Sequence, residues 1–470
     1  MKSLVLKFSE IDTKDRLTVD HYLSDDLQVI KGLEKSPYDL VSLGDFATVK
    51  GGKRLPPKAR YSSFGIPYVR VIDIGDYEIL LDDAVYISDE LHQKIKRYQL
   101  QQDDIGIVIV GATIGKTAIF KSSVSPCNFN ENLARITTNK QKLSPDFLLA
   151  YLQSSFGQAY ISWLTGGSAQ AKLSLERIAK IQVPLPPRSL QDKIAQVMQE
   201  AYRDRQKKLD ESETLLKGID GFVLNELGID LAKSQVKQNF LVSINELVGK
   251  RFDVESIAND FNVEDYPDIS WSNLQNFAHL PTTTKIASRN PEETFTYIGM
   301  PDVDNIYGEV CSQNLFGKDI KANKICIEGN DIVFARIEPC IYNLKIALIP
   351  SFIEEALGST ELLVARPKPD VIPSFLFWIL RSELIQRQIS GKVTGTTGRR
   401  RLPNKIFASL KIPQVSLNLQ QSIADEATKR RDEAKKLRTE AEAVVAVAKA
   451  RVERMILGEE VLTRLSNDKR

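Results

Sequence analysis

The chain has 470 residues, with 63 Lys and Arg against 61 Asp and Glu, and 42% of its residues are hydrophobic. That length is too great for one hydrophobic core and predicts at least two domains. The near-zero net charge excludes a chain that is basic throughout, so any affinity for nucleic acid must come from local clusters.

Neither a secretory signal nor a membrane span is predicted. Lys7 and Glu10 interrupt the apolar residues near the N-terminus, and no apolar run approaches the length that a membrane helix needs. The four cysteines show no CxxC spacing, which favours buried thiols in a reducing cytoplasm over a metal site. We therefore expect a cytoplasmic protein without a bound metal.

The first half of the chain divides into a lead-in (residues 1–36), a head of mixed helix and strand (37–187) and a long helix (188–231). The head contains short β-type runs such as IPYVRVIDI (66–74) and DIGIVIV (104–110), separated by Gly, Asn, Pro and Ser. Short strands with only one or two helices favour an α+β head over a doubly wound sheet.

The second half repeats this order. A lead-in (232–265) is followed by a second head (266–416), and a second long helix with a tail (417–470) closes the chain. The β-type runs of the second head include DIVFARI (331–337) and LKIALI (344–349). We expect two mixed heads, each followed by one long helix.

A stretch that occurs twice indicates a duplication. KIQVPLPPRSLQDKIAQ (180–196) matches SLKIPQVSLNLQQSIAD (409–425), and Pro184 and Pro413 lie 229 residues apart. Each copy reads as a buried strand, a proline break and the start of the long helix. Proline removes a backbone donor and forces the preceding residue out of the α conformation, so the strand must end there.

The internal match extends through both heads. LVSLGDFA (40–47) faces WSNLQNFA (271–278), and PDFLLAYLQS (145–154) faces PSFLFWILRS (373–382). The last two strings are expected to begin helices, since proline at the first turn has no donor to lose. A period near 230 residues is too long for a solenoid and indicates a duplicated domain pair.

The two long helices are expected to end at Gly228 and Gly458, because glycine readily adopts the left-handed conformation that stops a helix. Neither helix can bury its apolar stripe alone. We expect them to pack on each other, antiparallel and within one chain, with the heads at opposite ends. A homodimeric coiled coil is the alternative. The pairing residues are expected to be Leu190, Ile194, Val197, Leu216, Ile219, Leu419, Ile423, Leu437, Val444 and Val452.

Motifs for catalysis are scarce. GATIGKT (111–117) has one residue too few for a phosphate-binding P-loop, so a glycine turn between two strands is the simpler interpretation. A nucleotidase that uses Lys116 is the rival from the enzyme class, and a phosphate contact from Lys116 to nucleic acid lies between the two. His21, His92 and His279 are too dispersed for a metal motif. The sequence favours a protein that binds over one that catalyses.

Basic residues gather in glycine-containing loops of both heads. KGGKRLPPKAR (50–60) and the stretch 391–412 contain no acidic residue, and the loop TGGSAQ (165–170) aligns with TGTTGR (394–399). Glycine lets the backbone approach a phosphate, and Arg can contact guanine with two hydrogen bonds. The candidate DNA contacts are Lys50, Lys53, Arg54, Lys58, Arg60, Lys116, Ser168, Gln170, Lys172, Arg336, Thr396, Arg399, Arg400, Arg401 and Lys405. Ordinary solvated loops are the alternative for any single cluster.

Several strings together resemble the DNA-specificity subunit of type I restriction–modification systems. They are GIPYVRVIDIGD (65–76), GATIGKTAIF (111–120), NENLARI (130–136) and the stretch from TGGSAQ through LSLERIAKIQVPLPP to LQDKIA (165–195). The resemblance covers nearly the whole chain. The second half departs from it where EPCIYNLK (338–345) stands in place of GATIGK.

The resemblance implies two target-recognition domains, each reading one half of a split asymmetric DNA site, with the antiparallel helices as a ruler between them. It also implies a chain that is not catalytic by itself and binds no cofactor. Its partners would be double-stranded DNA, two methyltransferase subunits that use S-adenosylmethionine and, in some systems, motor-nuclease subunits that use ATP and Mg²⁺. The alternatives are a subunit of a methylase-only or type II-like system and a coiled-coil scaffold that does not bind DNA.

Overall fold

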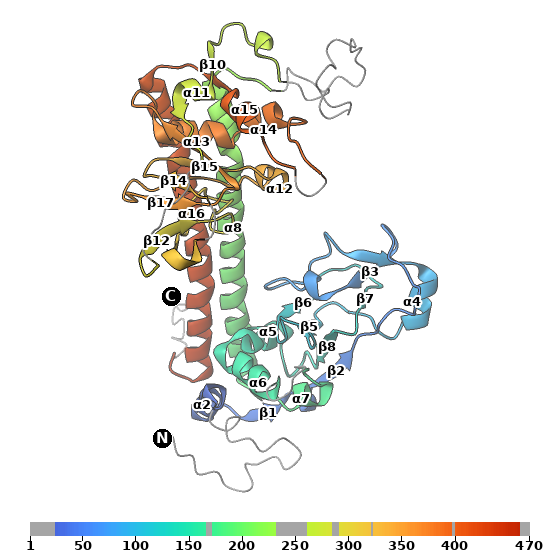
Figure 1. Ribbon diagram of the computed structural model, residues 1–470. Coiled ribbons are helices and arrows are strands. Elements are labelled where there is room, and N and C mark those ends of the chain that lie inside the picture. The colour runs from blue at the N-terminus through green and yellow to red at the C-terminus, as the bar shows by residue number, and fades with distance from the viewer. Residues whose placement is uncertain are drawn as a thin grey trace, which may run out of the picture. The chain divides into compact units, whose positions relative to one another are not determined.

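The computed structural model describes residues 24–165, 172–231, 261–283, 291–320, 323–396 and 400–460 (Figure 1). These residues form two compact units, one of Met1–Lys207 with Glu440–Arg470 and one of Lys208–Thr439. Each unit holds one head and one half of each long helix. The expected α+β heads and long helices are confirmed.

Each head begins and ends on one short antiparallel pair of strands. In the first unit β1 (Leu40–Ser42) pairs with β9 (Gln182–Pro184), and in the second β10 (Trp271–Asn273) pairs with β19 (Lys411–Pro413). In both, the strand that ends in proline leads within four residues into a long helix, α8 (Arg188–Glu226) or α16 (Leu417–Ile456). The predicted order of strand, proline and helix is therefore confirmed in both repeats.

The first head contains two sheets. A four-stranded sheet has the order β2-β8-β5-β6, and a three-stranded sheet has the order β4-β3-β7. The strands are β2 (Ala47–Gly51), β3 (Ile66–Val69), β4 (Val85–Ile87), β5 (Ile105–Val108), β6 (Thr117–Ile119), β7 (Asn128–Phe129) and β8 (Leu133–Thr138). The helical elements are α2 (Asp25–Gly32), η2 (Leu33–Lys35), α3 (Leu43–Phe46), η3 (Val71–Asp73), α4 (Asp89–Ile95), α5 (Pro145–Gln153), α6 (Ser155–Thr165) and α7 (Leu175–Ala179).

The second head repeats this plan. Its first sheet has the order β11-β18-β15-β16, which corresponds strand for strand to β2-β8-β5-β6, and its second has the order β13-β12-β17-β14. The strands are β11 (Ala278–His279), β12 (Thr294–Ile298), β13 (Gln313–Phe316), β14 (Ile325–Ile327), β15 (Ile332–Ala335), β16 (Ile346–Leu348), β17 (Ala356–Gly358) and β18 (Leu362–Pro367). The helical elements are η4 (Val263–Asp265), α11 (Leu274–Phe277), η5 (Gly317–Asp319), α12 (Glu338–Tyr342), α13 (Pro373–Arg381), α14 (Glu383–Ile389) and α15 (Asn404–Ala408).

Helices α5 and α13 fill corresponding places in the two heads. Both begin with proline at the first turn, as expected, and both are buried along most of their length. A serine precedes α5, and its hydroxyl accepts the Phe147 N–H. The heads differ between the third and fourth strands of the first sheet, where the first head has a turn and the second has α12.

The long helices stop where glycine permits it. Gly228 has φ +70° and Gly458 has φ +71°, so both adopt the left-handed conformation predicted for a helix end. Within the second unit, the Ser212 hydroxyl of α8 donates to the Ala434 carbonyl of α16 at 2.8 Å. Farther along α8, the Arg430 guanidinium of α16 lies 4.3 Å from the centre of the Phe222 ring. From the first contact to the second, the residue number rises along α8, from Ser212 to Phe222, and falls along α16, from Ala434 to Arg430. The helices therefore run antiparallel in this unit.

The same direction holds in the first unit. There Arg205 of α8 pairs with Glu442 of α16 at 3.1 Å. One apolar cluster contains three of the predicted pairing residues of α8, and it also contains residues from the far end of α16. These members are Leu190, Ile194, Val197, Ala448, Val452 and Met455. In the second unit, Ile219 and Ile423 share a cluster against which Leu216 and Leu419 pack.

Two of the predicted pairing residues of α16, Leu437 and Val444, are half-buried, whereas Val452 is fully buried. Ala434 and Ala441 are fully buried seven residues apart, and Val445 and Ala448 continue that seam. Val444 still packs on the cluster of the first unit.

The cysteines also differ from expectation. All four are free, but only Cys127 is buried, whereas Cys311 is exposed. Cys311 lies in the segment before β13. Among the helices that the structure describes, none is both long and apolar enough to cross a membrane.

Candidate nucleic-acid interface

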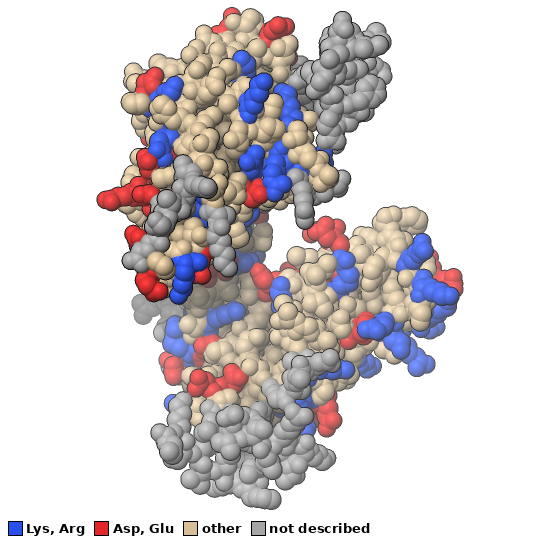
Figure 2. All heavy atoms as spheres, viewed as in Figure 1, with Lys and Arg blue, Asp and Glu red and all other residues tan. Residues whose placement is uncertain are grey.

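The first head presents its basic stretch on β2 and the loop that follows. All five predicted residues there are exposed: Lys50, Lys53, Arg54, Lys58 and Arg60. Two contacts hold the loop against the second sheet, since the Lys53 N–H donates to the Phe129 carbonyl at 3.1 Å and Arg54 pairs with Glu131. Lys and Arg atoms gather over the end of this head that carries β3, β7 and α4 (Figure 2). A fixed backbone with exposed cations is the arrangement that phosphate contacts need.

The GATIGK segment is a turn between β5 and β6. The Gly115 N–H donates to the Val108 carbonyl, and Gly111 and Gly115 have φ +119° and +90°. A strand follows the turn, whereas a P-loop leads into a helix. The backbone of Lys172 bridges to Val110 beside this turn, so the structure brings Lys172 and the turn together. Ser168 and Gln170 lie outside the described residues.

Lys116 is not a free cation on that turn. Its Nζ lies 3.5 Å from the carboxylate of Asp76, which also forms an ion pair with Arg205 of α8 at 3.0 Å. Arg205 in turn contacts Glu442 of α16. Asp76 therefore links the turn to both long helices within the first unit. The sequence contained a signal for it, because Asp76 is the last residue of the string GIPYVRVIDIGD.

In the second head, acidic residues from elsewhere in the chain meet the arginines. Arg401 contacts Glu361 through two nitrogens, at 2.8 and 2.6 Å, and this hydrogen bonding holds the pKa of the Glu361 carboxyl below its usual value. Arg400 lies 2.6 Å from Glu338. The linear stretch 391–412 has no acid, but the fold supplies two, so the net positive charge here is smaller than the sequence predicted.

The remaining predicted residues of the second head are divided between interior and surface. Arg336 is half-buried, and its guanidinium donates to the Leu402 carbonyl at 3.2 Å. Thr396 and Lys405 are exposed, and Arg399 lies outside the described residues. Lys345, which aligns with Lys116, donates to the Met300 carbonyl and so braces its own head.

Two backbone bridges lie at corresponding places in the two heads. Ile337 bridges to Arg401 in the second head, as Val110 bridges to Lys172 in the first. Each pair joins the end of the third sheet strand to the segment that follows the TGGSAQ or TGTTGR loop. The fold thus places the segments that contain Lys172 and Arg401 at corresponding sites in the two repeats, although their sequences differ.

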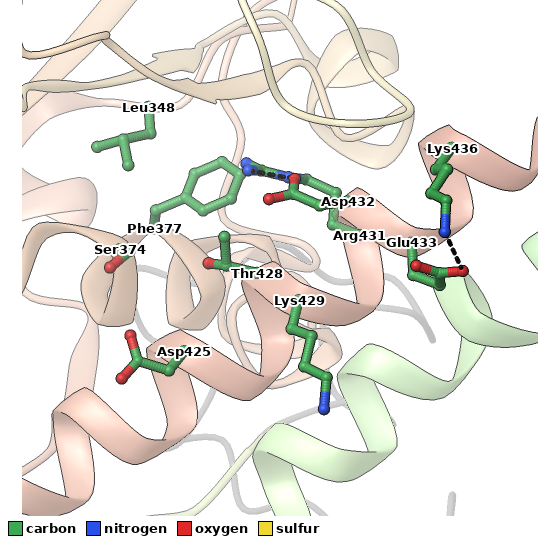
Figure 3. A pocket seen from close by; sticks show the side chains of 10 residues that line it. All are labelled: Leu348, Ser374, Phe377, Asp425, Thr428, Lys429, Arg431, Asp432, Glu433 and Lys436. Atoms are coloured by element: carbon green, nitrogen blue, oxygen red, sulfur yellow. Dashed lines mark hydrogen bonds and ion pairs between the residues drawn. The ribbon is translucent and has the colours of Figure 1, made fainter. Parts of the chain in front are cut away.

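A groove of about 590 Å³ lies between α13, β16 and the first half of α16 (Figure 3). Opposite charges line it in pairs, including Arg431 with Asp432 at 2.8 Å and Lys436 with Glu433 at 3.5 Å. A smaller groove, of about 340 Å³, lies at the corresponding place in the first unit between α5 and α8. There Lys121 lies between Asp103 and Asp146, 2.9 Å from each. The paired opposite charges in both grooves suit a polar protein partner better than a small ligand.

Comparison with known proteins agrees with this architecture. A model of the type I restriction modification DNA specificity domain matches residues 35–212 and 272–435. The EcoBI specificity subunit of Escherichia coli is 32% identical over 142 residues, which are 30% of this chain and 30% of that protein. The EcoAI specificity subunit of the same organism is 30% identical over 152 residues, 30% of this chain and 26% of that protein. These matches span less than a third of either relative's length.

A solved structure shares the fold across nearly the whole chain. It is a chain from a study of complex assembly and conformational transition of the type I R-M system, with a TM-score of 0.52 and 14% identity. The likeness covers 90% of this chain and 99% of that one. Because the family model covers most of both heads and part of both long helices, the protein belongs to the type I restriction–modification DNA specificity family.

Proposed function

We propose that this chain is the DNA-reading subunit of a type I restriction–modification complex. Each head reads one half of a bipartite, asymmetric site, and the paired helices α8 and α16 set the spacing between the halves. The observation that carries the proposal is the repeated sheet order, β2-β8-β5-β6 and β11-β18-β15-β16, with Lys172 and Arg401 in bridges at corresponding places and with different sequences around them. Two heads with the same sheet order but different loop sequences are expected to read two different half-sites.

The basic loop of the first head supplies the phosphate contacts in this proposal. Its five exposed cations bind the phosphates of the DNA backbone and so fix the position of the head on the duplex. Base edges are read from the same surface of the head. In the second head, Arg401 and Arg400 are held by Glu361 and Glu338, which orients two guanidinium groups for contact with bases.

The chemistry comes from partner subunits in this proposal. Two methyltransferase subunits that use S-adenosylmethionine methylate adenine at the bound site, and motor-nuclease subunits that use ATP and Mg²⁺ join the complex where restriction occurs. The two grooves at equivalent head–helix junctions offer each repeat a similar surface for such a partner.

The test is to map methylated adenines in cells that carry this chain together with its methyltransferase. We expect one bipartite motif, with two unlike halves and a spacer of fixed length. A contiguous motif, or no methylation that depends on this chain, would contradict the proposal. Loss of unmodified phage DNA in the same cells would distinguish a restricting system from one that only methylates.

A further inference from the structure

The basic stretch of the first head carries unusually exposed apolar side chains. From Lys50 through Ile72 the sequence has six Lys and Arg and no acidic residue. Within it, Phe64 is 79% exposed, Ile72 is 74% exposed and Tyr61 is 53% exposed. Large apolar side chains of this exposure cost hydration free energy, so a cationic segment that carries several of them indicates a binding surface.

The Phe64 loop is held in a defined conformation. Ser62 and Tyr86 exchange backbone hydrogen bonds at 2.9 and 3.3 Å, and the Ser62 hydroxyl donates to the Phe64 carbonyl at 2.5 Å. Gly65 has φ +123°, and a Cβ there would lie 2.5 Å from the Ile87 carbonyl oxygen. Only glycine fits after Phe64, so the backbone fixes where the phenyl ring is presented.

Contacts through Tyr68 join the aromatic loop to the cations. The Tyr68 ring centre lies 6.0 Å from that of Tyr61, and the Tyr68 hydroxyl donates to the Lys53 carbonyl at 2.7 Å. Tyr68 itself is buried, so Tyr61 and Lys53 rest on one rigid side chain. The exposed rings and the exposed cations are therefore parts of one surface.

Duplex DNA has the chemistry to cover this surface. Phosphates satisfy the cations, and base faces are the apolar surface that a protruding ring can contact. Proteins that combine basic residues with a protruding Phe, Leu or Ile insert that side chain between base pairs and partly unstack them. An acidic protein surface would pair the cations but would leave Phe64 in contact with polar groups.

We propose that Phe64 is a wedge that enters one base step of the half-site bound by the first head. This inference rests on the proposed function, because it assumes that the first head binds DNA. The ring occupies the step and bends the duplex there, so steps that unstack easily, such as TA and CA, are favoured at that position. Phe64 thereby contributes to specificity through the deformability of the DNA.

The test uses the full chain assembled with its methyltransferase subunits and a duplex that carries its mapped site. 2-Aminopurine replaces one base at a time in the half-site of the first head, except at the methylated adenine, which the methyltransferase itself displaces. The wild-type complex should raise the fluorescence at one step. Phe64→Ala should abolish that rise and weaken binding to the cognate site about tenfold, whereas Phe64→Trp should retain both.

Phe352 offers a matched control, because it is 83% exposed in the second head but is followed closely by Glu354 and Glu355. Phe352→Ala should leave fluorescence and affinity unchanged. If Phe64→Ala also leaves fluorescence and affinity unchanged while the wild-type complex binds its site, the proposed insertion of Phe64 is wrong and the proposed function stands. If the wild-type complex does not prefer its mapped site over other duplexes, the proposed function itself fails.

Discussion

The Asp220 carboxylate of α8 accepts the backbone N–H of Glu383, with both of its oxygens 3.2 Å from the nitrogen. Glu383 is the first residue of α14 in the second head, so Asp220 caps that helix. In the first unit, Glu453 of α16 accepts the Ser155 N–H at the start of α6, at 2.7 Å. Each head is therefore capped by the long helix that belongs to the other repeat, which ties both helices into both units.

Replacement of Asp220 should change how stability depends on pH. Burial raises the pKa of the Asp220 carboxyl to about 6, although the Glu383 N–H acts in the opposite direction. The folded state then binds more protons than the unfolded state, so stability falls as pH rises from about 4 to about 6. Asp220→Asn keeps an acceptor for Glu383 and should remove this fall, which is at most about 3 kcal/mol.

Urea unfolding of the full chain at several pH values measures this effect. Asp204→Asn, at an exposed position of the same helix, is the control and should retain the wild-type profile. An equal fall in stability for wild type and Asp220→Asn between pH 4 and pH 6 would contradict the assignment.

The close approach of the helices predicts a penalty for larger side chains in the seam. Ala434 is fully buried, and its carbonyl accepts the Ser212 hydroxyl of α8. Ala434→Leu should destabilise the chain by about 1–3 kcal/mol, because the added atoms overpack the contact. Ala443→Leu, at an exposed position of α16, should change stability little. Equal effects of the two substitutions would show that the helices do not pair at Ala434.

Much of the arrangement of strands and long helices was predictable because the same sequence features occur in both repeats. The proline that ends β9 recurs at the end of β19, and Gly228 and Gly458 stop both long helices. Local chemistry fixes these features, since proline ends a strand and glycine permits a left-handed residue in any fold. Because each proline and glycine recurs at the corresponding position of the other repeat, its occurrence there is not a chance match.

The charge of the candidate interface was not predictable in the same way. Glu361 and Arg401 are 40 residues apart in sequence, and only the register of β15 and β18 brings Glu361 close to Arg336 and Arg401. The degree of burial along α16 was not predictable in the same way either. Leu437 is half-buried, whereas Ala434 and Ala441 on either side of it are fully buried. Tertiary geometry overrides local composition in both cases.

Neutralising the basic loop should weaken binding to all DNA sequences alike. The double variant Lys53→Ala with Lys58→Ala removes two exposed cations, and the slope of log K against log salt concentration should become shallower by about 2. Lys217→Ala, an exposed α8 residue paired with Glu213, is the control and should retain the slope. Salt titrations with a duplex that lacks the site provide the measurement. An unchanged slope for the double variant would show that Lys53 and Lys58 do not contact DNA phosphates.

Removal of the Glu361 carboxylate should strengthen non-specific DNA binding by the second head. Glu361→Gln removes the carboxylate charge that pairs with Arg401 at 2.6 Å. We expect the salt slope of non-specific binding to steepen by about 1. Glu354→Gln removes an exposed acid from the same head and controls for the change in total charge. If both variants behave alike, Arg401 serves the fold of the head and does not contact DNA.

The spacing of the two half-sites tests the central claim most directly. The matched deletion of residues 205–211 from α8 and 435–441 from α16 removes one heptad from each helix, and so shortens each helix by about 10 Å. In the methylation map of cells carrying this variant and its methyltransferase, we expect both half-sites to be unchanged and the spacer to be about three base pairs shorter. An unchanged spacer, or an altered half-site, would contradict two separate readers held apart by a helical ruler.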